Sequence, residues 1–227
     1  MISQNNNADF YIDKINKKEH FSFTRWGDGE WFCAGGVNGS NCDKHQYFPE
    51  MSKDLRDALT SNKDYYKAIW PTTHGQIQKN LQHINSIITT NKISIKWANA
   101  IVWEDLVIRE GINKLITALE GRNFVIVSNS IKRKLPIKYV DFIEVPNVNC
   151  YLDKDRIKHQ MVEISKKYDD VVFGISASMA TNVIVDQLYD IIGDKSTMID
   201  FGSIWDPFTG VISRSYHREY LTTNIND

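Results

Sequence analysis

The sequence predicts an α/β fold, with a Rossmann-like, mainly parallel sheet of about seven strands and helices on both of its faces. Three observations predict it. Short apolar runs typical of buried strands recur along the chain, segments with helical spacing of apolar residues separate them, and glycine or proline marks several boundaries. Strands that alternate with helices are joined by right-handed crossovers, which produce a parallel sheet covered on both faces.

The first part of the chain begins this alternation. Residues 9–19 have helix-like spacing and lead into a short β-like run at residues 21–25. Residues 35–48 are rich in Gly, Asn and Ser, which indicates an irregular, mobile loop. Pro49 suits the first turn of a helix over residues 49–61, because the N–H that proline lacks has no helical partner at that position.

The middle of the chain continues the alternation of helices and strands. Residues 65–70 are typical of a strand, and residues 76–90 carry apolar residues along one helical face. Residues 93–98 return to strand-like alternation. Residues 104–119 again have helical spacing, with Gly121 as the stop.

The last part of the chain supplies the remaining strands. Residues 124–129 form a short apolar run of buried-strand type, and a further strand over residues 140–146 ends at a proline. The other expected elements are a helix, a strand, a helix and a strand at residues 153–168, 170–176, 179–192 and 196–202. Ligands of such sheets bind beyond the carboxyl ends of the strands, so the residues that follow each strand are the candidates for a site.

The bulk composition is that of a soluble globular chain, with 42% hydrophobic and 24% charged residues. The length suits one domain, which we expect to span residues 1–227. The formal net charge of −1 gives no general positive field to attract a nucleic acid. No secretory signal or membrane-spanning run is visible, so we expect a cytoplasmic protein without stable membrane insertion.

Cysteine and histidine spacing indicates no zinc chemistry. Cys33, Cys42 and Cys150 are odd in number and form no C-x-x-C pair, which argues against a disulfide framework and a structural zinc site. The histidines form no H-x-x-x-H or H-E-x-x-H pattern, which argues against a zinc hydrolase.

The stretch TRWGDGEW at residues 24–31 places two carboxylates, Asp28 and Glu30, directly after the first expected strand. Two carboxylates one residue apart can converge on one hard divalent cation, which keeps open positions for phosphate oxygens. Gly27 and Gly29 would let the backbone approach such a ligand closely. The same residues also fit an ordinary D-G turn, followed by a glutamate in the first turn of a helix. The residues alone leave both interpretations open.

The segment FTRWGDGEW resembles the R-[FY]-G-D-G-E opening of the GT-D glycosyltransferases, with Trp26 at the aromatic position. Three later segments are similar in order and spacing to the C-terminal half of that family: IEVPNVNCYLDKDRI, VVFGISASMATNVIVDQL and MIDFGSIWDPFTG. The resemblance implies that Asp28 and Glu30 occupy the two acidic positions of a D-x-E motif that serves metal and nucleotide-sugar binding. It also implies a UDP-sugar as the donor.

The turn from Gly174 to Met179 joins an expected strand to an expected helix and consists mostly of small residues. Ser176 and Ser178 can hydrogen-bond a phosphate there, and the unpaired N–H groups at the helix start favour an anion. The two serines can equally be plain N-caps of the helix. The turn is not G-x-G-x-x-G, so a nicotinamide site is poorly supported.

Several cationic side chains could pair with a diphosphate. Arg25 directly precedes the glycines and is the best placed, with an ion pair to a neighbouring carboxylate as the alternative. The segment SRSYHREY brings Arg214, His217 and Arg218 together. These three are either diphosphate partners, with His217 as a further metal ligand, or part of a solvated helix face.

Other candidates also follow expected strands. Asp206, in DFGSIWDPF, could act as general base toward an acceptor hydroxyl or contact a sugar hydroxyl, or it could only begin a turn. Glu104 is a second candidate base. His74, Asn99 and Trp103 could contact donor or acceptor, although a tryptophan is more often part of the core.

Together these residues favour a metal-assisted glycosyltransferase that moves a sugar from a UDP-sugar to a hydroxyl of a glycan or glycoconjugate acceptor. Mn²⁺ or Mg²⁺ held by Asp28 and Glu30 would neutralise charge on the departing diphosphate. A glycosidase is disfavoured, because carboxylates two residues apart are poorly disposed to flank a bond from opposite sides. A non-catalytic nucleotide-binding or partner-binding α/β domain is the alternative, since a fold does not by itself establish a chemistry.

Overall fold

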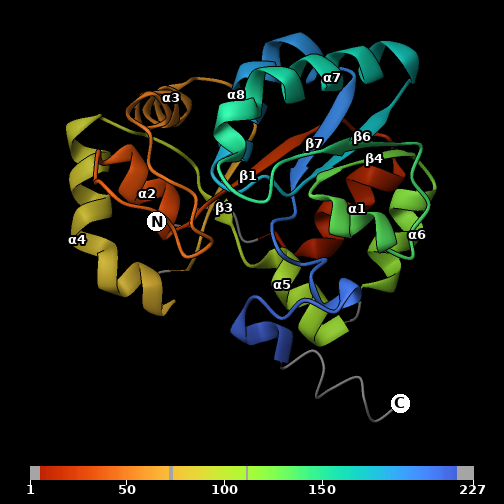
Figure 1. Ribbon diagram of the computed structural model, residues 1–227, viewed down its shortest axis with the longest axis horizontal. Helices are drawn as coiled ribbons and strands as arrows, with labels where there is room; N and C mark the ends of the chain where they lie inside the picture. The colour runs from red at the N-terminus through yellow and green to blue at the C-terminus, as the bar shows by residue number, and fades with distance from the viewer. Residues whose placement is uncertain (1–5, 72–73, 111, 219–227) are drawn as a thin grey trace.

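A computed structural model of the protein describes residues 6–71, 74–110 and 112–218. Within them, seven parallel strands form one open sheet with the order β3-β2-β1-β7-β6-β4-β5 (Figure 1). The strands are β1 (Ser22–Trp26), β2 (Tyr66–Ile69), β3 (Ala98–Asn99), β4 (Asn123–Ser128), β5 (Asp141–Glu144), β6 (Val171–Ile175) and β7 (Ser196–Asp200). The predicted α/β class and the predicted number of strands are confirmed.

Helices cover both faces of the sheet. One face packs against α2 (Asp28–Ala34), α3 (Pro49–Thr60), α4 (Gly75–Thr90), α7 (Lys154–Lys167) and α8 (Ala180–Ile192). The other face packs against α1 (Ala8–Asn16), α5 (Val102–Asp105), the π-helical turn η1 (Leu106–Glu110) and α6 (Asn113–Glu120). In Figure 1, α7 and α8 lie above the sheet, and α1, α5 and α6 lie below it. Short 3₁₀ helices complete the fold: η2 (Ser130–Lys134), η3 (Cys150–Asp153) and η4 (Pro207–Thr209).

The strand predicted at residues 93–98 is much shorter in the structure. Only Ala98 and Asn99 pair, with Ala68 and Ile69 of β2. Ile93 and Ile95 pack against the core although their backbone joins no ladder. Alternation in a sequence reports which side chains are buried, and here that burial is achieved at the edge of the sheet without strand pairing.

The helix predicted at residues 104–119 is divided in the structure into α5, η1 and α6. The sequence places a glycine at position 111, between η1 and α6. Glycine in a helix interior costs about 1 kcal/mol relative to alanine, so a continuous helix is disfavoured there. The division leaves Glu104 on the short helix α5, close to the carboxyl end of β3.

The position of the site follows from the order of the strands. From β1 the chain builds outward to β2 and β3, and then crosses the sheet to β4 and β5 before β6 and β7 fill the space back to β1, so the last strand, β7, lies beside the first, β1. In that central pair, Ser22 lies opposite Met198 and Phe23 opposite Ile199. The segments that follow Trp26 and Asp200 therefore emerge side by side, where open α/β sheets bind ligands.

No helix in the described part of the chain combines the length and the apolar character that crossing a bilayer requires.

Candidate functional site

A cleft of about 550 Å³ lies at the carboxyl ends of the strands. Its walls come from the segments after β1, β4, β6 and β7, from a loop at residues 41–45 and from residues 213–216. A second cavity, of about 620 Å³, is lined by residues that precede strands, among them Arg122 and Asp170, and lies at the opposite edge of the sheet. Most of the predicted site residues line the first cleft, which is the candidate site, and the exceptions are Asn99, Trp103, His217 and Arg218.

The cleft contains more negative than positive side chains. Six carboxylates line it, against three lysine or arginine residues. The carboxylates belong to Asp28, Glu30, Asp43, Glu104, Asp200 and Asp206. The cations belong to Arg25, Lys132 and Arg214.

Each of the three cations forms an ion pair with one or two of the cleft carboxylates, and two of the six carboxylates have no such partner among the described residues. Arg25 lies 3.4 Å from both Glu104 and Asp200. Lys132 Nζ lies 2.5 Å from Asp206 Oδ1, and Arg214 Nη2 lies 2.5 Å from Asp43 Oδ2. Within residues 6–71, 74–110 and 112–218, Asp28 and Glu30 are therefore the cleft carboxylates that form no ion pair.

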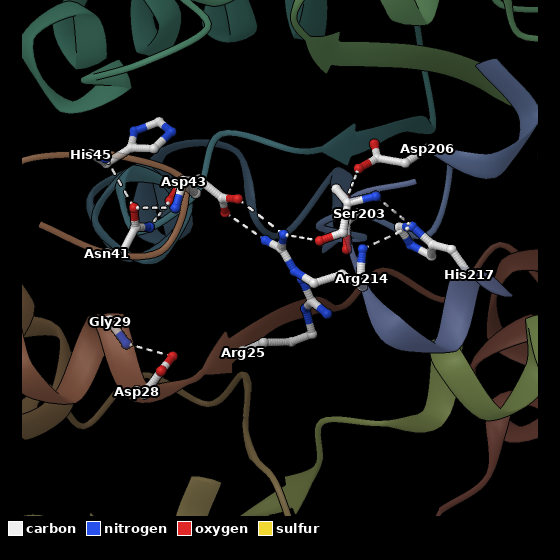
Figure 2. A network of polar contacts seen from close by, with 12 residues as sticks. Arg25, Asp28, Gly29, Asn41, Asp43, His45, Ser203, Asp206, Arg214 and His217 are labelled. Atoms are coloured by element: carbon white, nitrogen blue, oxygen red, sulfur yellow. Dashed lines mark hydrogen bonds and ion pairs between the residues drawn. The ribbon is translucent and has the colours of Figure 1, made fainter. Parts of the chain in front are cut away.

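Asp28 and Glu30 lie in the first turn of α2, which begins two residues after β1. Glu30 Oε2 accepts a hydrogen bond of 2.9 Å from the backbone N–H of Gly27, as the glutamate of a capping box does, although Gly27 has no side chain to return the bond. Asp28 Oδ1 accepts a 2.9 Å bond from the backbone N–H of Gly29 (Figure 2). The turn-and-helix interpretation of this motif thus describes the local structure, while convergence of the two carboxylates on a cation stays a prediction.

The electrostatic state of Glu30 is unusual for a carboxylate. Burial raises its pKa from 4.5 to about 7, and the negative charges of Asp200 and Asp28 act in the same direction, against the hydrogen bonds it accepts from backbone N–H groups. A cation beside it would favour the charged form and reverse this shift. The pair therefore fits a divalent ion in charge and ligand type.

Gly27 and Gly29 lie where packing within the protein leaves little room for a side chain. A Cβ built on Gly27 would lie 2.4 Å from Cζ3 of Trp70, and one on Gly29 would lie 3.1 Å from Cβ of Asn41. The indole of Trp70 in turn stacks on the ring of His74, with ring centroids 5.1 Å apart. The glycines thus let the motif pack between Trp70 and the loop that carries Asn41.

Arg25 is held by the protein on two sides. Besides the ion pairs of its guanidinium, its backbone N–H donates to Asp200 Oδ2 over 3.3 Å. Burial lowers the pKa of Arg25, but the carboxylates of Asp200 and Glu104 outweigh burial and raise it overall. The ion-pair alternative that the sequence left open describes this residue, although it also lines the cleft.

Ser176 and Ser178 reach the cleft from the turn before α8. The backbone N–H of Ser176 donates to Val127 O, which extends the pairing of β4 with β6. Ser178 has a φ of +53°, and its Oγ accepts a 2.9 Å bond from Asn41 Nδ2. No side chain caps α8, so these serines are not the plain N-caps of the alternative interpretation.

Asp206 precedes the 3₁₀ helix η4 and lines the cleft, as expected from its place after the last strand. Its carboxylate also accepts a short hydrogen bond from Ser213 Oγ. Lys132, which sequence reasoning missed, is only 3% exposed and reaches Asp206 from η2. The signal available in the sequence was its position just after β4, but Arg133 and Lys134 follow it directly and gave no basis for choosing among the three.

The cluster of Arg214, His217 and Arg218 is divided by the structure. His217 is fully buried, and its Nδ1 accepts bonds of 3.1 and 3.2 Å from the backbone N–H groups of Ser213 and Arg214 (Figure 2). The interpretation as a solvated face is therefore wrong for His217. Arg218 is exposed and does not line the cleft, whereas Arg214 does.

Two further candidates have structural roles. Trp103 is fully buried and packs edge-on against Phe201, as expected for a core tryptophan. Asn99 Oδ1 accepts a 3.2 Å bond from the backbone N–H of Ile101, which shapes the turn before α5.

Cys33 and Cys150 are buried free thiols, and Cys42 is an exposed one.

No group of three or more His, Cys, Asp or Glu side chains suited to one metal ion occurs in the described part of the chain. An ion held by Asp28 and Glu30 would take most of its ligands from water and a bound substrate. This is the usual situation of Mg²⁺ at a diphosphate, where the protein supplies one or two carboxylates.

Comparison with known proteins finds relatives at the level of the fold. No family model matches the chain, and no curated protein matches its sequence. Two solved structures do match it, with 14% sequence identity over 86% of this chain and 76% of theirs, and TM-scores of 0.60 and 0.57. Both are structures of domain of unknown function 1792, which one of them describes as having a distinct glycosyltransferase fold. The fold of this chain is accordingly glycosyltransferase-like.

Proposed function

We propose that the protein is a metal-dependent glycosyltransferase. It would move a sugar from a nucleotide sugar, a UDP-sugar by its resemblance to the GT-D enzymes, to a hydroxyl of a glycan or glycoconjugate acceptor. The observation that carries the proposal is the pair Asp28 and Glu30. Among the residues that the structure describes, they form no ion pair, whereas each lysine or arginine of the cleft is already paired. The glycosyltransferase-like fold supports it.

In this proposal Asp28 and Glu30 hold Mn²⁺ or Mg²⁺, which would supply charge neutralisation of the departing diphosphate. One carboxylate oxygen of Asp28, Oδ2, forms no hydrogen bond or ion pair with the described residues, so it is free to bind a cation. Glu30 would exchange its capping bond to Gly27 for the cation, or share its two oxygens between them.

The start of α8 would provide phosphate or nucleoside contacts. Ser176 and Ser178 face the cleft there, and the first N–H groups of a 13-residue helix carry partial positive charge.

Asp206 is the proposed general base. Its partner Lys132 holds the carboxylate in place, and a carboxylate within reach of the acceptor hydroxyl can take the proton as the bond to the sugar forms. Glu104 is the other acid of the cleft with a suitable position, and Arg25 holds it in the same manner.

Calorimetric titration of UDP and UDP-sugars with and without Mn²⁺ tests the proposal. The expected result is cation-dependent binding that Asp28→Asn weakens at least tenfold, together with sugar transfer or hydrolysis that EDTA abolishes. Asp57→Asn, which removes an exposed carboxylate of α3, is the matched control and should bind as the wild type does. Tight UDP binding without any turnover would favour the non-catalytic alternative, and cation-independent binding unchanged in Asp28→Asn would remove the proposed metal site.

A further inference from the structure

The ion pair between Arg214 and Asp43 joins two parts of the chain that are 171 residues apart. Arg214 Nη1 donates to Asp43 Oδ1 over 3.0 Å and Nη2 donates to Oδ2 over 2.5 Å, so the two planar groups face each other in a fork (Figure 2). Asp43 lies on the loop after α2, and Arg214 follows η4. Both side chains line the cleft.

Arg214 differs from the other two cations of the cleft in its freedom to change partner. The side chain of Lys132 is 3% exposed and that of Arg25 is 15% exposed. The side chains of Arg214 and Asp43 are 33% and 38% exposed, and exposed ion pairs contribute about 0 to 1 kcal/mol, with a bidentate pair at the upper end of that range. A ligand can therefore replace Asp43 on Arg214 at small cost.

The position of Arg214 brings its charge within range of the proposed metal site. Arg214, Asp28 and Glu30 line the same cleft, and Asn41, two residues before the ion-pair partner Asp43, lies with its Cβ 3.1 Å from the Cβ position of Gly29 in the acidic motif. The pKa of Glu104, which burial raises, is lowered by both Arg25 and Arg214. Arg214, the carboxylates of α2 and the carboxylates held by Arg25 thus line one cleft.

A guanidinium fork binds a carboxylate and a phosphate in the same manner, through two parallel N–H···O bonds. Asp43 therefore presents to Arg214 the pair of oxygens that a diphosphate would present. We infer that Arg214 is a diphosphate-binding residue of the cleft and that Asp43 occupies its guanidinium when no ligand is bound. The inference rests on the proposed function in one respect only, that the ligand is an anionic diphosphate.

Exchange would also change the loop that carries Asp43. Once the diphosphate takes the guanidinium, the charge of Asp43 is left without its cation, while Asn41 and His45 stay attached through other bonds. The exchange thus frees the side chain of Asp43 while the rest of the loop keeps its hydrogen bonds.

The test is calorimetric titration with inorganic pyrophosphate and with UDP, in Mn²⁺, of Asp43→Asn and Arg214→Gln. If Asp43 competes with the ligand, Asp43→Asn binds both ligands more tightly, by roughly two- to fivefold, which is the range that an exposed ion pair allows. Arg214→Gln binds them roughly tenfold or more weakly, because a charge-assisted bidentate contact is lost. The gain from Asp43→Asn should vanish in the double variant.

A purely structural ion pair would give a different result. Both single variants would then loosen the same contact and change affinity in the same direction, which would overturn the inference, as would unmeasurable binding of both ligands in Asp43→Asn. Asp57→Asn and Arg109→Gln, which break exposed i,i+4 pairs elsewhere, are the controls for the charge changes and should leave affinity unchanged. Failure of the proposed function is distinguishable, because it appears as absent sugar transfer and as Asp28→Asn binding normally, whatever Arg214 does.

Discussion

The guanidinium of Arg25 occupies the space that a side chain on Gly202 would need, since a Cβ built on Gly202 would lie 1.5 Å from Arg25 Nη2. Gly202 also has a φ of +52°, in the left-handed region that favours glycine. It follows Asp200, the ion-pair partner of Arg25, by two residues. The turn after β7 is thus shaped by the need to hold Arg25 between two carboxylates.

Gly202→Ala should destabilise the protein strongly, because it adds both backbone strain and a collision with a buried cation. Strain of this kind costs about 1 to 3 kcal/mol, and overpacking about 1 to 3 kcal/mol more. Gly210→Ala separates the two effects, since Gly210 has a φ of +78° but nothing within 4 Å of its Cβ position. Urea unfolding should show a clearly larger loss of stability for Gly202→Ala. Equal losses would show that Arg25 moves aside freely.

Glu30→Gln should change how stability depends on pH. Because the pKa of Glu30 rises from 4.5 to about 7 on folding, the folded state binds more protons than the unfolded state between these values. The contribution of Glu30 to stability is therefore full below pH 4.5 and is lost as the pH rises toward 7, by up to about 3 kcal/mol. Glutamine keeps the cap on Gly27 and cannot titrate.

Unfolding free energies in EDTA, measured from pH 4.5 to 7, check this. The variant should lose less stability than the wild type across that interval. Glu163→Gln is the control, since Glu163 is exposed and the hydrogen bond from Lys166 lowers its pKa. Parallel curves for the wild type and Glu30→Gln would contradict the raised pKa.

Lys67→Met should flatten the stability curve at higher pH. Lys67 is 2% exposed and donates to Ser61 O and Oγ, and burial lowers its pKa from 10.5 to about 8. The unfolded state then binds more protons between pH 8 and 10.5, so the wild type gains stability as the pH rises, by up to about 3 kcal/mol. Denaturation at pH 8 and pH 10 should show this gain in the wild type and in the exposed control Lys53→Met, but not in Lys67→Met.

Asn41→Ala should loosen the loop over the cleft. The side chain of Asn41 accepts hydrogen bonds from the backbone N–H groups of Asp43 and His45, and it donates to Ser178 Oγ. Amide hydrogen exchange of Asp43 and His45 should accelerate roughly fivefold or more, because each amide loses a bond that contributes about 1 kcal/mol. Ser178→Ala removes only the contact with the side-chain amide and should leave those two amides largely protected. If amide hydrogen exchange were unchanged in Asn41→Ala, the side chain of Asn41 would not be what holds the loop in place.

The alternation of elements could be predicted from the sequence because it depends on local spacing. The order of the strands could not, since the chain gives no local sign that β7 inserts between β1 and β6. For the same reason, the length of the edge strand β3 could not be predicted. Residues 93–96 alternate as a strand does, but whether they pair depends on their position relative to β2.

The site could be predicted in part. The acidic pair, the turn at Ser176 and the loop at Asp206 were identified from their positions after strands, and all line one cleft. The partners of Arg25 were not, because Glu104 and Asp200 lie 79 and 175 residues away. Contacts over such distances depend on the assembled sheet, and one sequence contains no pattern that reports them.

The sheet also constrains how the chain can fold during its synthesis. Strands β1 to β3 and strands β4 and β5 pair among themselves, and the two blocks become one sheet only through β6 and β7, which are made last. Until about residue 200 has left the ribosome, β1 keeps an open edge, and so does β4 until β6 pairs with it and presents an open edge in its place. Each open edge can pair with another chain. The nascent protein is therefore most exposed to aggregation just before the ligand cleft is formed, and the same insertion closes both edges and completes the cleft.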